Sequence, residues 1–290
     1  MKYRDIEYEC TVKVLIDDIY YSNASYDTKV ARIRKYAEIL VRRLLKYDPE
    51  KPLTLGHRNT LNKLDKNQYT EPLLRDSLKQ LNSYGSESTH SQKREPANKH
   101  EYEEAIQNLL NIYAYLFVDY FKNNRFGSNP SIVSAFSLLP PIIRSIALQE
   151  LYAQDPDNLL VINKLLIAIV KAEGILSARK WLEDNRSFLI KKGTGVNDDL
   201  RKSIVLQHGE EIADIIISQI PDSNMYEDGL KILESFSDFT PLYTDFESAL
   251  SYYKTHGIIA GQTKDVEDFN SLLLFVFSGR KEKELSSTDY

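Results

Sequence analysis

Apolar residues recur every three or four positions along most of this chain, which is the spacing of one face of an α-helix. The longest such stretch begins near His100 and continues to Phe121. Its apolar positions are Ile106, Leu109, Leu110, Tyr113, Leu116, Phe117 and Tyr120. A helix with such a face has to bury it against neighbouring helices. This stretch is therefore the element around which the first part of the chain is organised.

Two helices are predicted near the N-terminus. Residues 5–22 carry apolar side chains at helical spacing, although the alternation over residues 10–14 is also compatible with the start of a strand. Cys10 lies on the apolar stripe, which indicates a buried thiol. The second helix is predicted from about Thr28 to Lys46, with Asp27 as its N-cap. Its apolar seam consists of Val30, Ile33, Ala37, Leu40 and Leu44.

A polar segment precedes the long apolar helix. After a short helix over residues 55–64, another helix is expected to begin at Thr70-Glu71-Pro72. We expect Gly85 to end it, because glycine readily adopts the left-handed conformation that follows many helices. Residues 86–90 would then form a polar turn, and residues 91–99 a basic loop. A loop held between two rigid helices is a common position for functional side chains.

The rest of the chain is also helical by its spacing, and no long apolar–polar alternation indicates a sheet. Residues 123–130 are polar and contain glycine and proline, so they mark the predicted domain boundary. We predict an all-α protein with a helical bundle at 1–126, a second domain of short stacked helices at 130–280 and a disordered polar tail at 281–290. Helices of the second domain are expected near residues 131–139, 141–153, 157–171, 175–185, 197–219, 224–236, 243–255 and 264–278.

Charge is unevenly distributed along the chain. Residues 1–130 hold 21 Lys and Arg against 18 Asp and Glu, whereas the remaining residues hold 16 against 24. Neither half has the strong basic excess of a dedicated nucleic-acid-binding protein, so such a contact would have to be local. The single cysteine excludes an intramolecular disulfide, and no apolar run is long enough to span a bilayer. We therefore expect a cytoplasmic protein that does not enter the membrane.

The chemical motifs are sparse. None of the five histidines is paired with another ligand at the spacing of a metal site, and no phosphate-binding glycine loop is present, so we expect no metal and no cofactor. The exception is the loop around His90, where hydroxyls, imidazoles and cations could hold a nucleic-acid backbone, or where His90 could act as a base in RNA cleavage. A solvated loop without a function is the alternative. The candidate binding residues are Ser86, His90, Lys93, Arg94, Lys99 and His100.

The succession of residues 34–40, 55–64 and 81–90, followed by the long helix, resembles the HEPN superfamily. The closest group is the uncharacterised domain that is often attached to restriction and abortive-infection proteins. The similarity covers roughly residues 1–125, and in the second helix Arg34 and Glu38 resemble that group's Arg-x-x-x-Glu pattern.

The helix before the loop carries the more informative part of the resemblance. In the resembled group it ends in the pattern Arg-x-x-Gly-Asn-x-x-x-His. Here Gly85 and His90 match in register, Ser86 stands where Asn is expected, and Asn82 stands where Arg is expected. The order of residue types therefore agrees with the pattern at two positions and departs from it at two.

The resemblance implies a helical bundle, frequent dimerisation and, in some members, RNA cleavage without metal by an Arg and a His separated by four to six residues. Residues 83–85, where that Arg would lie before His90, contain none. We therefore expect a non-catalytic binding or regulatory protein, in the setting of prokaryotic defence against viral or other foreign nucleic acid. Expected partners are RNA or DNA, another protein, or a second copy of the chain. Two alternatives stay open: a divergent HEPN ribonuclease, and an assembly module whose acidic half docks a basic partner.

Overall fold

The structure is a computed structural model that describes residues 4–89, 95–193, 195–196, 198–220, 223–236 and 244–283. Across these ranges the chain is helical and forms no strand, although an isolated antiparallel bridge joins Gly193 and Asn224. The predicted all-α class is confirmed. None of the helices in the described ranges is long and apolar enough to cross a membrane.

The chain folds into two compact units, and the first of them is discontinuous in sequence. Unit 1 consists of residues 1–147 and 242–290, and unit 2 consists of residues 148–241. Helices α14 (Phe246–His256) and α15 (Lys264–Phe277) therefore belong with the N-terminal helices and not with the helices that precede them in the chain.

This division differs from the boundary predicted at residues 123–130. The ring of Phe126 packs against Phe121 with a centroid distance of 4.8 Å and against Phe136 with a distance of 5.7 Å. Phe121 lies on one side of the predicted boundary and Phe136 on the other. The segment therefore continues the core of unit 1, although its composition is that of a linker.

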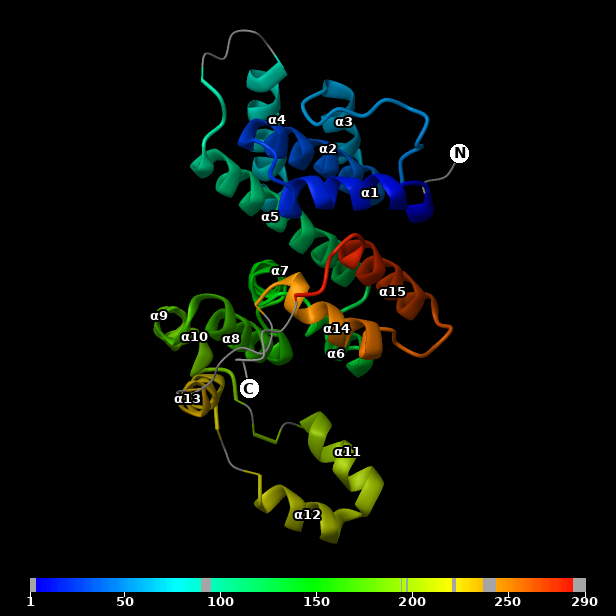
Figure 1. The fold of residues 1–290 in the computed structure, drawn as a ribbon. Coiled ribbons are helices and arrows are strands. Elements are labelled where there is room, and N and C mark those ends of the chain that lie inside the picture. The colour runs from blue at the N-terminus through cyan, green and yellow to red at the C-terminus, as the bar shows by residue number, and fades with distance from the viewer. Residues whose placement is uncertain are drawn as a thin grey trace. The chain divides into compact units, whose positions relative to one another are not determined.

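The helices of unit 1 pack around α5 (Figure 1). Helices α2 and α4 contact each other and α5. All five residues of the predicted α2 seam are buried. In chain order, the elements before the discontinuity are η1 (Asp5–Glu7), α1 (Glu9–Ile16), the π-helical η2 (Asp17–Tyr21), α2 (Tyr26–Leu44), α3 (Arg58–Lys66), α4 (Pro72–Thr89), α5 (Lys99–Asn123), α6 (Pro130–Phe136) and α7 (Pro141–Gln154), the last of which runs into unit 2.

Two details near the N-terminus differ from the sequence prediction. Cys10 is exposed, because the buried face of α1 is formed by Val12, Leu15 and Ile16 and Cys10 lies off that face. The N-cap of α2 is Ser25, whose hydroxyl accepts the N–H of Thr28, so Asp27 lies inside the first turn.

The end of α4 also differs from the prediction. The helix continues through Gly85 to Thr89, since a glycine inside a helix costs only about 1 kcal/mol relative to alanine and does not have to end it. The residues expected to form the start of the polar turn are thus helical. The next helix, α5, is preceded by Asn98, whose side chain accepts the N–H of Glu101 at 3.1 Å while the Glu101 carboxylate accepts the N–H of Asn98 at 2.9 Å.

Helix α5 is buried on all sides in its central part. Every residue from Ile112 to Val118 is buried, although the sequence pattern predicts a single apolar face. Helix α15 covers a further face, because Phe269 packs against Phe117, Tyr120 and Phe121 with centroid distances of 5.9, 5.0 and 6.0 Å. The return of the chain to unit 1 thus completes the core around α5.

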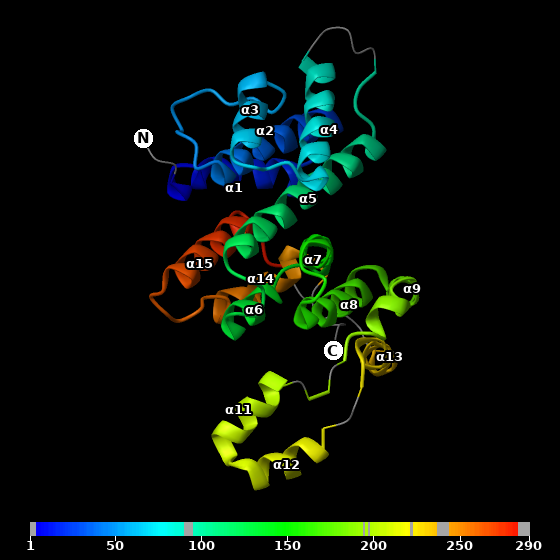
Figure 2. The same cartoon turned by 180° about the vertical axis from the view of Figure 1, so that it is seen from behind.

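Unit 2 contains a small helical core and a helical hairpin (Figure 2). The core is formed by α8 (Leu159–Glu173), α9 (Ile175–Asp184), α10 (Arg186–Leu189) and α13 (Met225–Ser235). Gly229 lets α13 approach α9, because a Cβ at that position would lie 2.6 Å from the side chain of Leu182. The hairpin pairs α11 (Asp198–His208) with α12 (Glu210–Ser218) through Gly209, whose φ is 78°.

The second half of the chain contains a further helix cap, and its tail makes a contact with the N-terminal part of unit 1. Asn158 caps α8 by accepting the N–H of Val161 at 3.3 Å, so the helix begins two residues after the predicted start at 157. Of the tail predicted at 281–290, Lys281 donates its backbone N–H to the hydroxyl of Tyr21 at 3.1 Å. Residues 284–290 lie outside the described ranges.

Candidate functional site

The structure describes the side chains of only two of the six predicted binding residues. His90, Lys93 and Arg94 lie outside the described residues. Ser86 lies in the last turn of α4, and its side chain is not described. Lys99 and His100 begin α5, where both are exposed. The prediction that these six residues form one binding surface therefore remains a prediction.

Lys99 and His100 face carboxylates one helical turn further along α5. Lys99 Nζ lies 3.4 Å from Glu103, and His100 Nδ1 lies 3.6 Å from Glu104. Glu104 also accepts a hydrogen bond of 2.6 Å from the hydroxyl of Tyr84 on α4. The glutamates of these pairs reduce the positive charge at the start of α5.

A closed polar cluster connects α2, α4 and the turn before α3. Arg34 Nη2 donates to Asn82 Oδ1 at 3.3 Å. Glu38, one turn along α2, accepts the backbone N–H of Leu55. Burial raises the pKa of Glu38, and Arg34 partly offsets that rise. Arg34, Glu38 and Asn82, three of the polar residues named in the family resemblance, therefore lie close together.

The backbone fits tightly around this cluster. A Cβ built on Gly56 would lie 2.2 Å from the amide nitrogen of Asn82. Arg34 Nε is buried and has no hydrogen-bond partner among the described residues. Asn82 is thus held between a guanidinium and a glycine backbone, and a larger residue in its place would have to displace one of them.

A pocket with a volume of about 420 Å³ lies elsewhere in unit 1, and no sequence motif predicts it. It is bounded by the end of α2, the C-terminal part of α5 and the N-terminal half of α15. Both signs of charge occur on its wall. Its lining residues are Arg43, Lys46, Leu116, Asp119, Tyr120, Asn123, Asn124, Lys264, Asp265, Asp268, Ser271 and Leu272.

Some charged groups of the pocket are held by neighbours. Arg43 Nε lies 3.0 Å from the carboxylate of Asp5, and Arg43 Nη2 donates to the Ser271 hydroxyl at 3.2 Å. Asp265 accepts a hydrogen bond of 3.3 Å from the side chain of Asn129, and the hydroxyl of Thr263 holds the pKa of Asp265 below its usual range. These groups form the fixed part of the wall.

Other charged groups of the pocket lack such partners. Lys46, Lys264 and Asp268 are exposed, and their side chains make no hydrogen bond or ion pair with the residues that the structure describes. Burial, followed by the nearby charge of Arg43, lowers the pKa of Lys46. Burial also raises the pKa of Asp119, although the hydroxyl of Tyr69 donates a hydrogen bond to it. The protein therefore tolerates ionisable groups here in unfavourable surroundings, which is common at binding sites.

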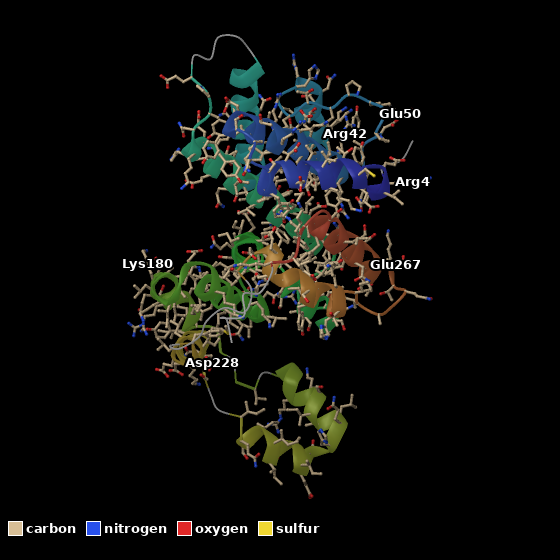
Figure 3. The ribbon with its side chains drawn as sticks, viewed as in Figure 1. Arg4, Arg42, Glu50, Lys180, Asp228 and Glu267 are labelled. Carbon is tan, nitrogen blue, oxygen red and sulfur yellow. The ribbon has the colours of Figure 1, made fainter. Side chains whose placement is uncertain are left out.

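Figure 3 shows the side chains around these elements, including the labelled Arg42 on α2, Glu50 in the following loop and Glu267 on α15. Arg42 donates to the backbone carbonyl of Asp48 at 3.0 Å and thereby fixes the turn that carries Lys46. Lys46 itself has a φ of 47°, a conformation that few residues other than glycine and asparagine adopt readily. The backbone thus places Lys46 at the pocket at some conformational cost.

A buried cation outside the pocket, Arg280, lies just after α15. Its guanidinium carbon lies 4.1 Å from the ring centre of Tyr20 and 4.4 Å from that of Phe246. Arg280 Nη1 lies 3.3 Å from the carboxylate of Glu247, and Nη2 donates to the hydroxyl of Tyr113 at 3.4 Å. We refer to Arg280 and these four partners as the arginine clasp. It connects η2, α5 and α14 to the segment after α15.

Metal-binding groups and similar proteins are two other possible guides to the function. In the ranges that the structure describes, no three His, Cys, Asp or Glu residues are grouped so that they could hold a metal ion. Comparison with protein-family models, with curated proteins and with solved structures returns no match.

Proposed function

We propose that this chain is a non-catalytic binding or regulatory protein with an HEPN-like N-terminal bundle. Its partner is RNA or DNA, bound by the segment between α4 and α5, and its biological setting is prokaryotic defence against foreign nucleic acid. The observation that carries the proposal is the hydrogen bond from Arg34 to Asn82. Asn82 stands at the position where the resembled group has an arginine.

The chemistry of phosphate cleavage explains why this contact favours binding. An arginine that stabilises a reacting phosphate has to direct its guanidinium towards the substrate. Here the guanidinium of Arg34 is engaged inside the cluster, and the amide of Asn82 carries no charge that could take its place. The cations that remain for a phosphate backbone are Lys93, Arg94 and, despite its glutamate neighbour, Lys99.

The test is a pair of assays on the full chain: RNA cleavage without added metal, and RNA binding as a function of salt. Replacing Lys93, Arg94 and Lys99 together by Glu should weaken binding and flatten its salt dependence, since each lost phosphate contact removes about 0.9 from the slope on duplex nucleic acid and about 0.7 on single strands. His90→Ala should leave binding nearly unchanged. The matched control replaces three cations of unit 2, Arg179, Lys180 and Lys191, by Glu.

Two outcomes contradict the proposal. A catalytic histidine contributes typically about 10²–10⁴-fold to rate, so cleavage by the wild type that disappears in His90→Ala would establish the ribonuclease alternative. Equal weakening by both triple variants would show that binding follows net charge and not this segment.

The hairpin of unit 2 favours the assembly function as a second candidate. Leu206, Ile212 and Ile215 are exposed to 88%, 53% and 60% on α11 and α12. Exposed apolar groups beside acidic residues, here Glu210 and Glu211, suit a partner helix with an apolar stripe and a basic flank. A basic amphipathic peptide should bind the wild type at least tenfold more tightly than the Leu206→Glu, Ile215→Glu variant. Equal binding of both would remove this candidate.

A further inference from the structure

The charged pocket of unit 1 is lined by exposed groups of both signs that have no close side-chain partner. Arg43 is neutralised by Asp5, and Asp265 is satisfied by Asn129 and Thr263. Lys46 and Lys264 remain as cations without a direct partner, and Asp268 remains as a carboxylate without one, among the residues that the structure describes. A simple anion would be attracted by the two lysines but repelled by the carboxylates. A simple cation would be attracted by the carboxylates but repelled by the lysines.

The two helix ends at the pocket also carry partial charges of opposite sign. The C-terminal end of α5, at Asn123 and Asn124, carries the negative end of that helix dipole, and the N-terminal end of α15, at Lys264, carries the positive end. A molecule with an anionic group and an ammonium group close together can satisfy both ends and both sets of side chains. The helix ends thus reinforce the preference that the side chains set.

Size and apolar surface narrow the ligand further. A volume of about 420 Å³ is within the usual range for small-molecule sites, which is roughly 300–1,000 Å³. Leu116 and Leu272 add an apolar wall to the charged groups. A ligand that fits all three features has a carboxylate, an ammonium and a short apolar side chain.

We propose that this pocket binds a free α-amino acid with an apolar side chain. The carboxylate of the ligand contacts Lys46, and its ammonium contacts Asp119 and Asp268. Lys46, Asp119 and Asp268 line the same pocket, so one small molecule can reach all three. The inference does not depend on nucleic-acid binding, because the pocket and the predicted loop share no residue.

The experiment measures binding by calorimetry and by the shift of the melting temperature of the full chain. The ligands are L-leucine, N-acetyl-L-leucine without the ammonium, L-leucinamide without the carboxylate, and inorganic phosphate. Leucine should bind, and each blocked derivative should bind about 10- to 100-fold more weakly, as expected when a charge-assisted hydrogen bond is lost. Because these four ligands are compared on the wild type, the result does not depend on the folding of any variant.

Two variants locate the site. Lys46→Asn removes the charge while retaining a residue that tolerates a positive φ, and it should weaken leucine binding at least tenfold. Asp268→Asn should weaken it as well. The matched control is Lys66→Asn, the same substitution at an exposed position of α3, which should bind leucine as the wild type does.

Three results would overturn the inference. The first is that leucine neither binds nor changes the melting temperature. The second is that phosphate or N-acetyl-leucine binds as tightly as leucine, which would define an anion site. The third is that Lys46→Asn and Lys66→Asn bind leucine equally, which would place the ligand elsewhere.

Discussion

Unit 1 contains two regions in which charged side chains gather, and they differ in burial and in how closely the charges are paired. In the arginine clasp, Arg280 has a side chain that is only 2% exposed, and it is enclosed by two aromatic rings, a carboxylate and a phenol. In the pocket, Lys46 is exposed, and burial shifts the half-buried Asp119 clearly away from its charged form by raising its pKa. The clasp therefore contributes to stability, whereas the ionised form of Asp119 in the pocket is disfavoured by burial.

The direction of the pKa shifts expresses the same contrast. Burial alone would lower the pKa of Arg280, but Tyr20, Tyr113 and Glu247 hold it well above its ordinary value. For Lys46 the neighbouring acids do not offset burial and Arg43. Ionisable groups with shifted pKa values in a pocket are common at binding sites.

The largest expected effect is at the clasp. Arg280→Ala should lower the free energy of unfolding by about 3–5 kcal/mol, because Glu247 is then left partly buried without its cation. Arg280→Lys should recover only part of this loss, since an ammonium cannot stack between Tyr20 and Phe246 as a guanidinium does. Urea denaturation provides the measurement, and Lys281→Ala next to it is the control that should change little. A wild-type midpoint for Arg280→Ala would refute the stabilising role of the clasp.

An intermediate effect is expected at Gly279, which leads into the clasp. Its φ is 77°, and a Cβ there would lie 2.9 Å from the backbone Cα of Lys13. Gly279→Ala should cost about 1–3 kcal/mol from backbone strain, and more when the contact with α1 is included. Gly174→Ala is the matched control, because Gly174 has a φ of 91° with open space around its Cα. If the two substitutions cost the same, close contact with α1 is not what positions the clasp.

The smallest effect, and the opposite sign, is expected in the pocket. Asp119→Asn should raise stability slightly at neutral pH, because burial makes the ionised carboxylate unfavourable while the amide oxygen still accepts from Tyr69. The pKa of Asp119 is raised on folding, so its cost is absent below the ordinary aspartate pKa and appears as the pH rises through the folded value. Melting curves at pH 3 and pH 7 test this. If Asp119→Asn is less stable than the wild type at pH 7, the ionised Asp119 stabilises the fold, as the paired charges of the arginine clasp do.

The helices were predictable because their signals are local. Apolar spacing and the start at Pro72 fix most elements near the predicted positions. The exceptions follow from weak local signals: Gly85 permits an end to α4 without requiring it, and Ser25 and Asp27 both favour a cap. Tertiary contacts decide which of the two residues caps α2. The N–H of Ala97, for example, donates a hydrogen bond of 2.7 Å to Asp27.

The sites were less predictable because they join distant segments. The pocket requires α15 to return to α5, and nothing in the local sequence indicates which helices share a core. One signal was nevertheless present: Asp119 is the only charged residue between Glu104 and Lys122, within the most apolar helix of the chain. Arg43 and Lys46 lie at the end of α2, and their local sequence contains no sign of the neighbours that the fold brings to them.

The discontinuity of unit 1 also determines the order in which the chain can fold during synthesis. Unit 2 is continuous, so it can fold on the ribosome while unit 1 still lacks α14 and α15. Until these helices emerge, the nascent chain leaves Phe117, Tyr120 and Phe121 without Phe269, their partner on α15. A chain whose translation stops before residue 246 keeps this aromatic surface open to chaperones and proteases. Arg280, which is added after both helices, therefore closes the core only of chains whose translation has passed that point.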